Sequence, residues 1–161
     1  MMALAAIQVL LFNHIHFMGY GTPLVYVALL LYFPANANRS ATLLWAFSLG
    51  LLMDVFAGTE GISAASMTLA AFIQPSLLNV SLPKDSLEDM VPSYRTMGVW
   101  NHLRYLTVLI LTHHLAYYAL ESFSFFNIVS LGISAGTGFV TSWVTIALME
   151  TLRGKKQNAN G

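Results

Sequence analysis

An aspartate and two pairs of histidines are the residues of this 161-residue sequence that could do chemistry in apolar surroundings. Asp54 interrupts the run SATLLWAFSLGLLMDVFAG, and His14, His16, His113 and His114 lie in two other apolar runs. An ionisable group in such a run indicates an ion or proton pathway, a metal site, or a buried hydrogen-bonded contact. The choice among these depends on the elements that carry the side chains.

The spacing of the histidines argues against a metal site. His14 and His16 are two residues apart, so on a helix they point about 200° away from each other, and the adjacent pair His113 and His114 also diverges. No HExxH motif is present. We therefore expect no metal, no cofactor and no catalytic residue, and imidazoles that meet interfacial water at the extracytoplasmic ends of their helices.

The composition is typical of a membrane protein. Of all residues, 57% are hydrophobic and 9% are charged, whereas soluble domains carry about 25% charged residues. Seven basic and seven acidic residues give no net charge, which argues against a nucleic-acid partner. The absence of cysteine excludes disulfides and thiolate chemistry.

Six apolar runs predict six membrane-spanning helices in a single all-α domain. Their expected bounds are about 1–17, 20–38, 41–57, 61–80, 102–121 and 125–152, and a disordered polar tail follows at 153–161. The apolar part of the second run, residues 23–33, rises only about 16 Å across a hydrocarbon core of about 30 Å. It must therefore extend, thin the bilayer or pack against protein. Residues 81–101 are expected to form an aqueous loop.

The basic residues predict the orientation. With six spans, all of them fall on one side of the membrane, which is then the cytoplasmic side and holds both termini. They are Arg39, Lys84, Arg95, Arg104, Arg153, Lys155 and Lys156. The opposite ends of the spans carry Glu60 and Glu121. On the cytoplasmic side, His102 is expected to join Trp100 and Arg104 as an interfacial anchor.

Asp54 should face protein rather than lipid. It lies about 21 Å from the cytoplasmic end of its helix, and Ala46, Gly50, Asp54 and Gly58 recur at every fourth position. Small residues at that spacing let another helix approach closely. We expect the carboxylate to accept hydrogen bonds from N–H groups at the helix start near residues 61–64, or from a tyrosine or histidine of the fifth span. This predicts a packing and capping role, with an ion or substrate pathway as the alternative.

A second small-residue pattern lies in the last span. Gly132 and Gly136 form a GxxxG motif, and Ser134 and Gly138 form a neighbouring stripe with the same spacing. Such a motif is typical of a close-packing seam between membrane helices. The seam could lie within the bundle or against the helix of a partner protein.

The stretch GLLMDVFAGTEGISAASMTLAAFIQP, residues 50–75, resembles the MreD family of bacterial rod-shape-determining membrane proteins. In that family a glycine precedes an aspartate near the end of one span, and a short glycine-containing loop leads into a span rich in small residues. Gly50, Asp54, Gly58 and Gly61 occupy those places here. The runs LFNHIHFMGYGTPLVYVALLLYFP and LTHHLAYYALESFSF are similar to variants found in Bacteroidetes. The chain departs from the family at its front, where it starts almost directly in the first span.

The resemblance implies a fold and a role. The fold would be a six-helix membrane bundle similar to the substrate-binding subunits of energy-coupling-factor vitamin transporters. The role would be that of a non-catalytic scaffold in the inner membrane, which binds MreC directly and, through it, the MreB filament and the RodA–penicillin-binding-protein synthase. Two alternatives stay open: a small-molecule-binding subunit of a vitamin transporter, and a lipid-modifying enzyme that uses Asp54, Glu121 and His113 or His114.

Overall fold

The computed structural model describes residues 25–34, 37–81, 91–122 and 128–159, and every regular element among them is helical. The predicted all-α fold class is therefore confirmed. In chain order the elements are η2 (Val25–Tyr32), α2 (Arg39–Ala57), α3 (Ile62–Ser81), α4 (Tyr94–Met97), α5 (Val99–Ser122) and α6 (Ile128–Ala159). The four long helices lie close to the spans predicted at 41–57, 61–80, 102–121 and 125–152. The span predicted at 1–17 lies outside the described residues, and so do His14 and His16.

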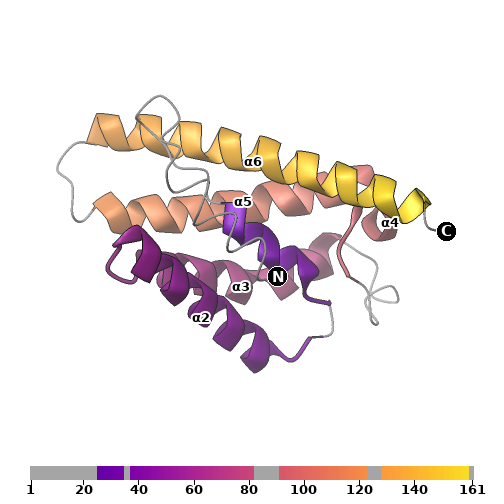
Figure 1. Cartoon of the computed structure of the whole chain (residues 1–161), viewed down its shortest axis with the longest axis horizontal. Coiled ribbons are helices and arrows are strands. Elements are labelled where there is room, and N and C mark those ends of the chain that lie inside the picture. The colour runs from indigo at the N-terminus through magenta and orange to yellow at the C-terminus, as the bar shows by residue number, and fades with distance from the viewer. Residues whose placement is uncertain (1–24, 35–36, 82–90, 123–127, 160–161) are drawn as a thin grey trace.

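The long helices are neighbours in the order α2, α3, α5, α6 (Figure 1). Since α5 and α6 run in opposite directions, the start of α5 and the end of α6 lie together at the end of the bundle that holds α4. Within the described ranges, two helical stretches are long and apolar enough to cross a membrane, Arg39–Ala57 and Gly132–Thr151. Helices α3 and α5, with 20 and 24 residues, would be about 30 and 36 Å long at 1.5 Å per residue.

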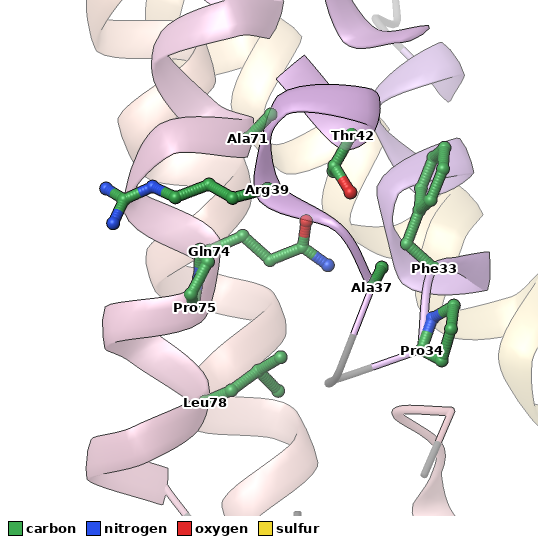
Figure 2. Close-up of a pocket in the computed structure, with 9 residues that line it drawn as sticks. All are labelled: Phe33, Pro34, Ala37, Arg39, Thr42, Ala71, Gln74, Pro75 and Leu78. Atoms are coloured by element: carbon green, nitrogen blue, oxygen red, sulfur yellow. The ribbon is translucent and has the colours of Figure 1, made fainter. Parts of the chain in front are cut away.

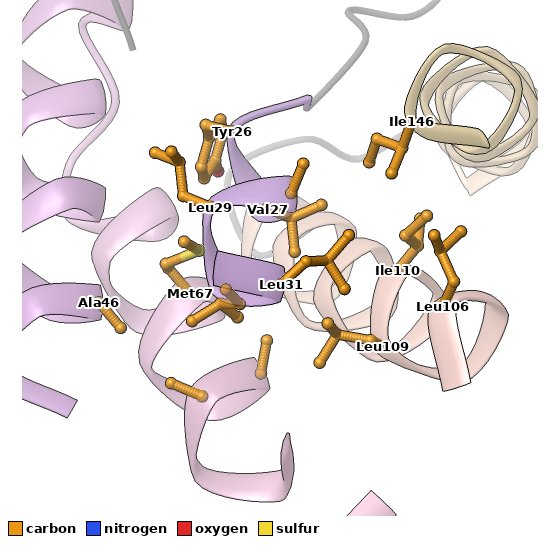
Figure 3. Packing of buried hydrophobic residues seen from close by; sticks show 14 of the residues in the cluster. Tyr26, Val27, Leu29, Leu31, Ala46, Met67, Leu106, Leu109, Ile110 and Ile146 are labelled. Carbon is orange, nitrogen blue, oxygen red and sulfur yellow. The ribbon is translucent and has the colours of Figure 1, made fainter. Parts of the chain in front are cut away.

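The described part of the second apolar run is buried inside the bundle. Residues 25–32 form the 3-10 helix η2, and Tyr26–Leu31 are each at most 3% exposed. Eight residues of 3-10 helix rise only about 16 Å. Figure 3 shows this helix between Met67 of α3, Leu109 of α5 and Ile146 of α6. A helix that is apolar on every side is stable only when it is surrounded, so this run packs against protein instead of forming the long span predicted at 20–38.

Two polar segments are more ordered than the sequence suggested. Helix α6 continues to Ala159 through most of the predicted tail, because arginine, lysine, glutamine and alanine favour helix. In the predicted loop at 81–101, Ser93 caps the short helix α4 in a reciprocal capping box with Thr96. Met97 of α4 is buried in the core, so this part of the segment packs on the bundle instead of lying free in water.

Candidate functional site

The carboxylate of Asp54 joins the end of α2 to the start of α3. Its two oxygens accept hydrogen bonds from the backbone N–H groups of Ser63 at 2.8 Å and Ala64 at 2.9 Å, and the hydroxyl of Thr59 donates a third bond. The side chain is 4% exposed. These N–H groups lie in the first turn of α3, where no intrahelical acceptor exists and the helix dipole is positive. The hydrogen bonds predicted for Asp54 are therefore present.

Glycines shape the turn that brings these groups together. Gly58 ends α2 in the left-handed conformation at φ 68°, and its N–H donates to the carbonyl of Asp54. Gly61 has φ 82° immediately before α3. Both conformations favour glycine because a Cβ atom would clash with the backbone. Gly58 is exposed, so it serves as a helix cap rather than as the fourth member of the predicted packing face.

Gly50 allows α2 and α3 to touch through their backbones. A Cβ atom built at Gly50 would lie 2.4 Å from the Cα of Ala64 and 2.6 Å from the carbonyl oxygen of Ser63. Ala46, one turn earlier, is fully buried. The predicted small-residue seam thus runs from Ala46 through Gly50 to Asp54. It fixes the position along α3 at which the Asp54 carboxylate makes its contacts.

The two histidines of α5 connect it to the helices on either side. The Ser66 hydroxyl of α3 donates to the Ser63 carbonyl at 3.2 Å, and its oxygen lies 3.3 Å from Nε2 of His113. His114 donates from Nδ1 to the carbonyl of Ile110 at 2.9 Å, which leaves Nε2 to accept from the hydroxyl of Ser142 in α6 at 3.1 Å. The histidines diverge as predicted. Both are buried, however, so they do not meet interfacial water.

These contacts form a series across the bundle. Asp54 joins α2 to α3, the Ser66–His113 contact joins α3 to α5, and the His114–Ser142 contact joins α5 to α6. Interhelical hydrogen bonds of this kind contribute about 0.6 kcal/mol each in membranes, and up to about 2 kcal/mol. Each pair of neighbouring long helices is therefore held by a buried polar contact in addition to apolar packing.

A buried contact between a histidine and a glutamate lies near the opposite end of α5. Nε2 of His102 is 3.6 Å from a carboxylate oxygen of Glu150 in α6, and both side chains are buried. The ring of Tyr94 in α4 lies over that imidazole, with 4.4 Å between ring centroids. Burial, and secondly the charge of Glu150, raise the pKa of Tyr94. The predicted anchor cluster is therefore wrong for His102, because Trp100 and Arg104 are exposed and His102 points inward.

Helix α6 presents different small residues to its inner and outer faces. Ser142, Ile146 and Glu150 are buried, and a Cβ atom at Gly138 would lie 2.5 Å from the hydroxyl oxygen of Tyr118. Gly132 and Gly136 are exposed, and no described residue lies within 4 Å of a Cβ atom at either position. The GxxxG motif is therefore not a seam within the described part of the bundle. The alternative of a partner helix stays a prediction.

A small cavity lies between the start of α2 and the residues that follow η2, beside Gln74 and Pro75 of α3 (Figure 2). Gln74 donates from Nε2 to the carbonyl of Leu30 at 2.8 Å, which ties α3 to η2. The cavity volume is about 20 Å³, enough for about one water molecule. Within the described ranges, no three histidine, aspartate or glutamate side chains are placed to share a metal ion.

Sequence reasoning missed several of these polar residues. Glu150 interrupts an apolar run just as Asp54 does, and an acid at such a position indicates a buried partner, so its pairing could have been anticipated. Ser66 and Ser142 gave no comparable signal, since serine is common on any face of a membrane helix. Only the fold shows that each lies opposite a histidine of α5.

Comparison with known proteins gave no match to any protein-family model, any curated protein or any solved structure.

Proposed function

We propose that this chain is an MreD-type membrane scaffold, which binds the single-span protein MreC and so helps organise peptidoglycan synthesis during cell elongation. The observation that carries the proposal is the junction of α2 and α3. Gly50, Asp54, Gly58 and Gly61 are the residues on which the resemblance depends. Each has a distinct structural role in this junction. Gly50 makes the backbone contact and Asp54 caps the start of α3. Gly58 caps the end of α2, and Gly61 forms the turn before α3.

The distribution of side chains supports a multi-pass membrane location. Large apolar residues cover the outward faces of the long helices, for example Trp45 at 59% and Val55 at 74% exposed. The buried set instead includes Asp54, Gln74 and Glu150. Soluble monomers rarely expose contiguous apolar patches of more than a few hundred Å², whereas ionisable residues of membrane bundles face the interior. Lipid is the solvent that suits this arrangement.

The charges support an orientation with the start of α2 in the cytoplasm. Arg39 begins α2, Arg95 lies in α4 and Arg104 lies in the second turn of α5, while α6 runs toward the basic segment at 153–156. Glu60 and Glu121 lie at the other ends of these helices. The positive-inside rule makes the basic side cytoplasmic.

A scaffold role suits the chemistry of the site. The Asp54 carboxylate is engaged by three donors, and His114 uses both ring nitrogens in hydrogen bonds. Groups held in this way stabilise a bundle and are poorly placed to exchange protons with a substrate. A vitamin-binding subunit would need a pocket of about 300–1,000 Å³, whereas the cavity that described residues form beside Gln74 has a volume of about 20 Å³.

Co-purification tests the proposal. The chain, tagged at its C-terminus, is expressed with MreC from the same genome and purified in mild detergent. We expect stoichiometric recovery of MreC, and none with a tagged membrane protein of unrelated fold. Recovery of an ATP-hydrolysing transport module in place of MreC would favour the vitamin-transporter alternative and contradict the proposal.

A further inference from the structure

The segment around α4 covers the buried His102–Glu150 contact at one end of the bundle. Helix α4 has only four residues, Tyr94–Met97, and lies against both α5 and α6. The Tyr94 ring lies over the imidazole of His102, which pairs with Glu150, and Met97 is 4% exposed in the core. Arg95, between these two anchors, is exposed. The segment is thus held by two side chains over the buried His102–Glu150 contact.

A single glycine connects this segment to α5. Gly98 has φ 75° and ψ 157°, a combination that is essentially restricted to glycine. A Cβ atom at this position would meet no atom within 4 Å. The glycine is therefore required by the backbone conformation and not by lack of space. Residues that absorb a large change of φ and ψ at the end of an element are typical hinges.

We propose that residues 93–98 form a flap, hinged at Gly98, which closes over the His102–Glu150 pair and can open without unfolding the bundle. Closure needs three things: the glycine-only conformation of Gly98, the Tyr94–His102 ring contact, and the pairing that holds the imidazole in place. Opening exposes a histidine and a carboxylate that are otherwise shielded. Since α4 precedes α5 on the side with the basic residues, the flap would present this change to the cytoplasm.

The two arginines nearest in sequence to His102 are not buried with the pair. Arg95 and Arg104 belong to the same two elements but are exposed, and the neighbouring Tyr105 ring lies 6.3 Å from the imidazole of His102. Removing the charge of Glu150 should therefore weaken closure, as should removing the imidazole. A substitution at Gly98 should weaken closure without touching either side chain.

Limited trypsin digestion of the full chain in detergent tests the flap. Arg95 lies within it, so cleavage after Arg95 requires the flap to open, whereas cleavage after Arg104 requires α5 itself to unfold. We expect Gly98→Ala, His102→Gln and Glu150→Gln each to accelerate cleavage after Arg95 by at least about fivefold. Mass spectrometry of the fragments separates the two sites, and cleavage after Arg104 should stay at the wild-type rate.

Two matched variants control for general destabilisation. Gly58→Ala places an alanine at another positive-φ glycine with open space around it, and His114→Gln removes a buried histidine near the other end of α5. Neither should change the rate of cleavage after Arg95 by more than about twofold. The flap is refuted if the controls accelerate this cleavage as much as Gly98→Ala and His102→Gln do. It is also refuted if cleavage after Arg104 rises in parallel in the flap variants.

Discussion

The backbone of Gly50 lies directly against that of Ala64, so closely that a Cβ atom at Gly50 would stand 2.4 Å from the Ala64 Cα. The atoms it would meet are backbone atoms, which cannot turn aside as a flexible side chain could. Helices α2 and α3 would have to separate, and the Asp54 carboxylate would then lose its geometry with the N–H groups of Ser63 and Ala64. The glycine and the aspartate therefore act as one unit.

The first prediction concerns this unit. Gly50→Ala should lower the free energy of unfolding by about 1–3 kcal/mol, the usual cost of overpacking, which corresponds to a fall in melting temperature of about 2–4 °C per kcal/mol. Gly132→Ala is the matched control, since its Cβ atom would meet no described residue within 4 Å. The measurement is thermal unfolding in detergent. Equal melting of the two variants would contradict the backbone contact.

The second prediction concerns the outer face of α6. Gly132→Leu and Gly136→Leu should leave the melting temperature within about 2 °C of the wild type, because no described residue lies within 4 Å of a Cβ atom at either position. If a partner helix packs there, the same variants should reduce co-purification of MreC, since close approach needs small residues. Leu148→Phe, at an exposed position of the same helix that lies away from the Gly132–Gly136 stripe, serves as the control. Undiminished recovery of MreC with both leucine variants would show that MreC does not bind at Gly132 and Gly136.

The third prediction separates structure from catalysis at the histidines. His113→Leu and His114→Leu each remove one interhelical hydrogen bond and should cost about 0.5–2 kcal/mol. We expect the wild-type protein to have no enzymatic activity that either substitution could remove. Lipid-linked peptidoglycan precursors incubated with the wild-type protein should therefore stay unchanged on chromatography. Turnover by the wild type that disappears in either variant would support the lipid-modifying enzyme instead.

The fourth prediction concerns orientation. Cysteines placed at Glu60 and Glu121 should react with an impermeant maleimide added outside intact spheroplasts. A cysteine at Arg95 should react only after the membrane is opened, because the basic residues lie on the cytoplasmic side. The chain has no cysteine of its own, so each label reports a single position. Labelling of position 95 from outside would contradict the proposed orientation.

Much of the fold follows from patterns that the sequence displays. The four long helices could be predicted because each is an apolar run bounded by polar or glycine-containing segments, and the bounds differ by only a few residues. The start of α3 could be named as one of two alternative partners of Asp54 because a short turn brings it near the carboxylate. Only the structure decides against the other alternative, a tyrosine or histidine of the fifth span. The helical state of residues 153–159 was missed because a charged segment was expected to be disordered, although its residues favour helix.

Other features depend on contacts that no local pattern encodes. The run at 25–32 is apolar on every side, and such a run suits a span or a buried core element equally well. His102 was taken as an anchor because of its neighbours in sequence, whereas its actual partner, Glu150, is 48 positions away on α6. The inner and outer stripes of α6 differ by two positions, and only the packing of Tyr118 against Gly138 decides which stripe faces inward.

The most direct test of the central claim is to measure melting temperature and MreC recovery together for Asp54→Asn and Asp54→Leu. Asparagine keeps the shape and one acceptor oxygen, so it should retain folding and most MreC binding. Leucine leaves the N–H groups of Ser63 and Ala64 unpaired, and it should cost about 1–3 kcal/mol. Recovery of MreC should then fall only in proportion to the loss of folded protein. If Asp54→Leu melts at the wild-type temperature and still loses MreC, Asp54 is a partner contact and the structural account of it is wrong.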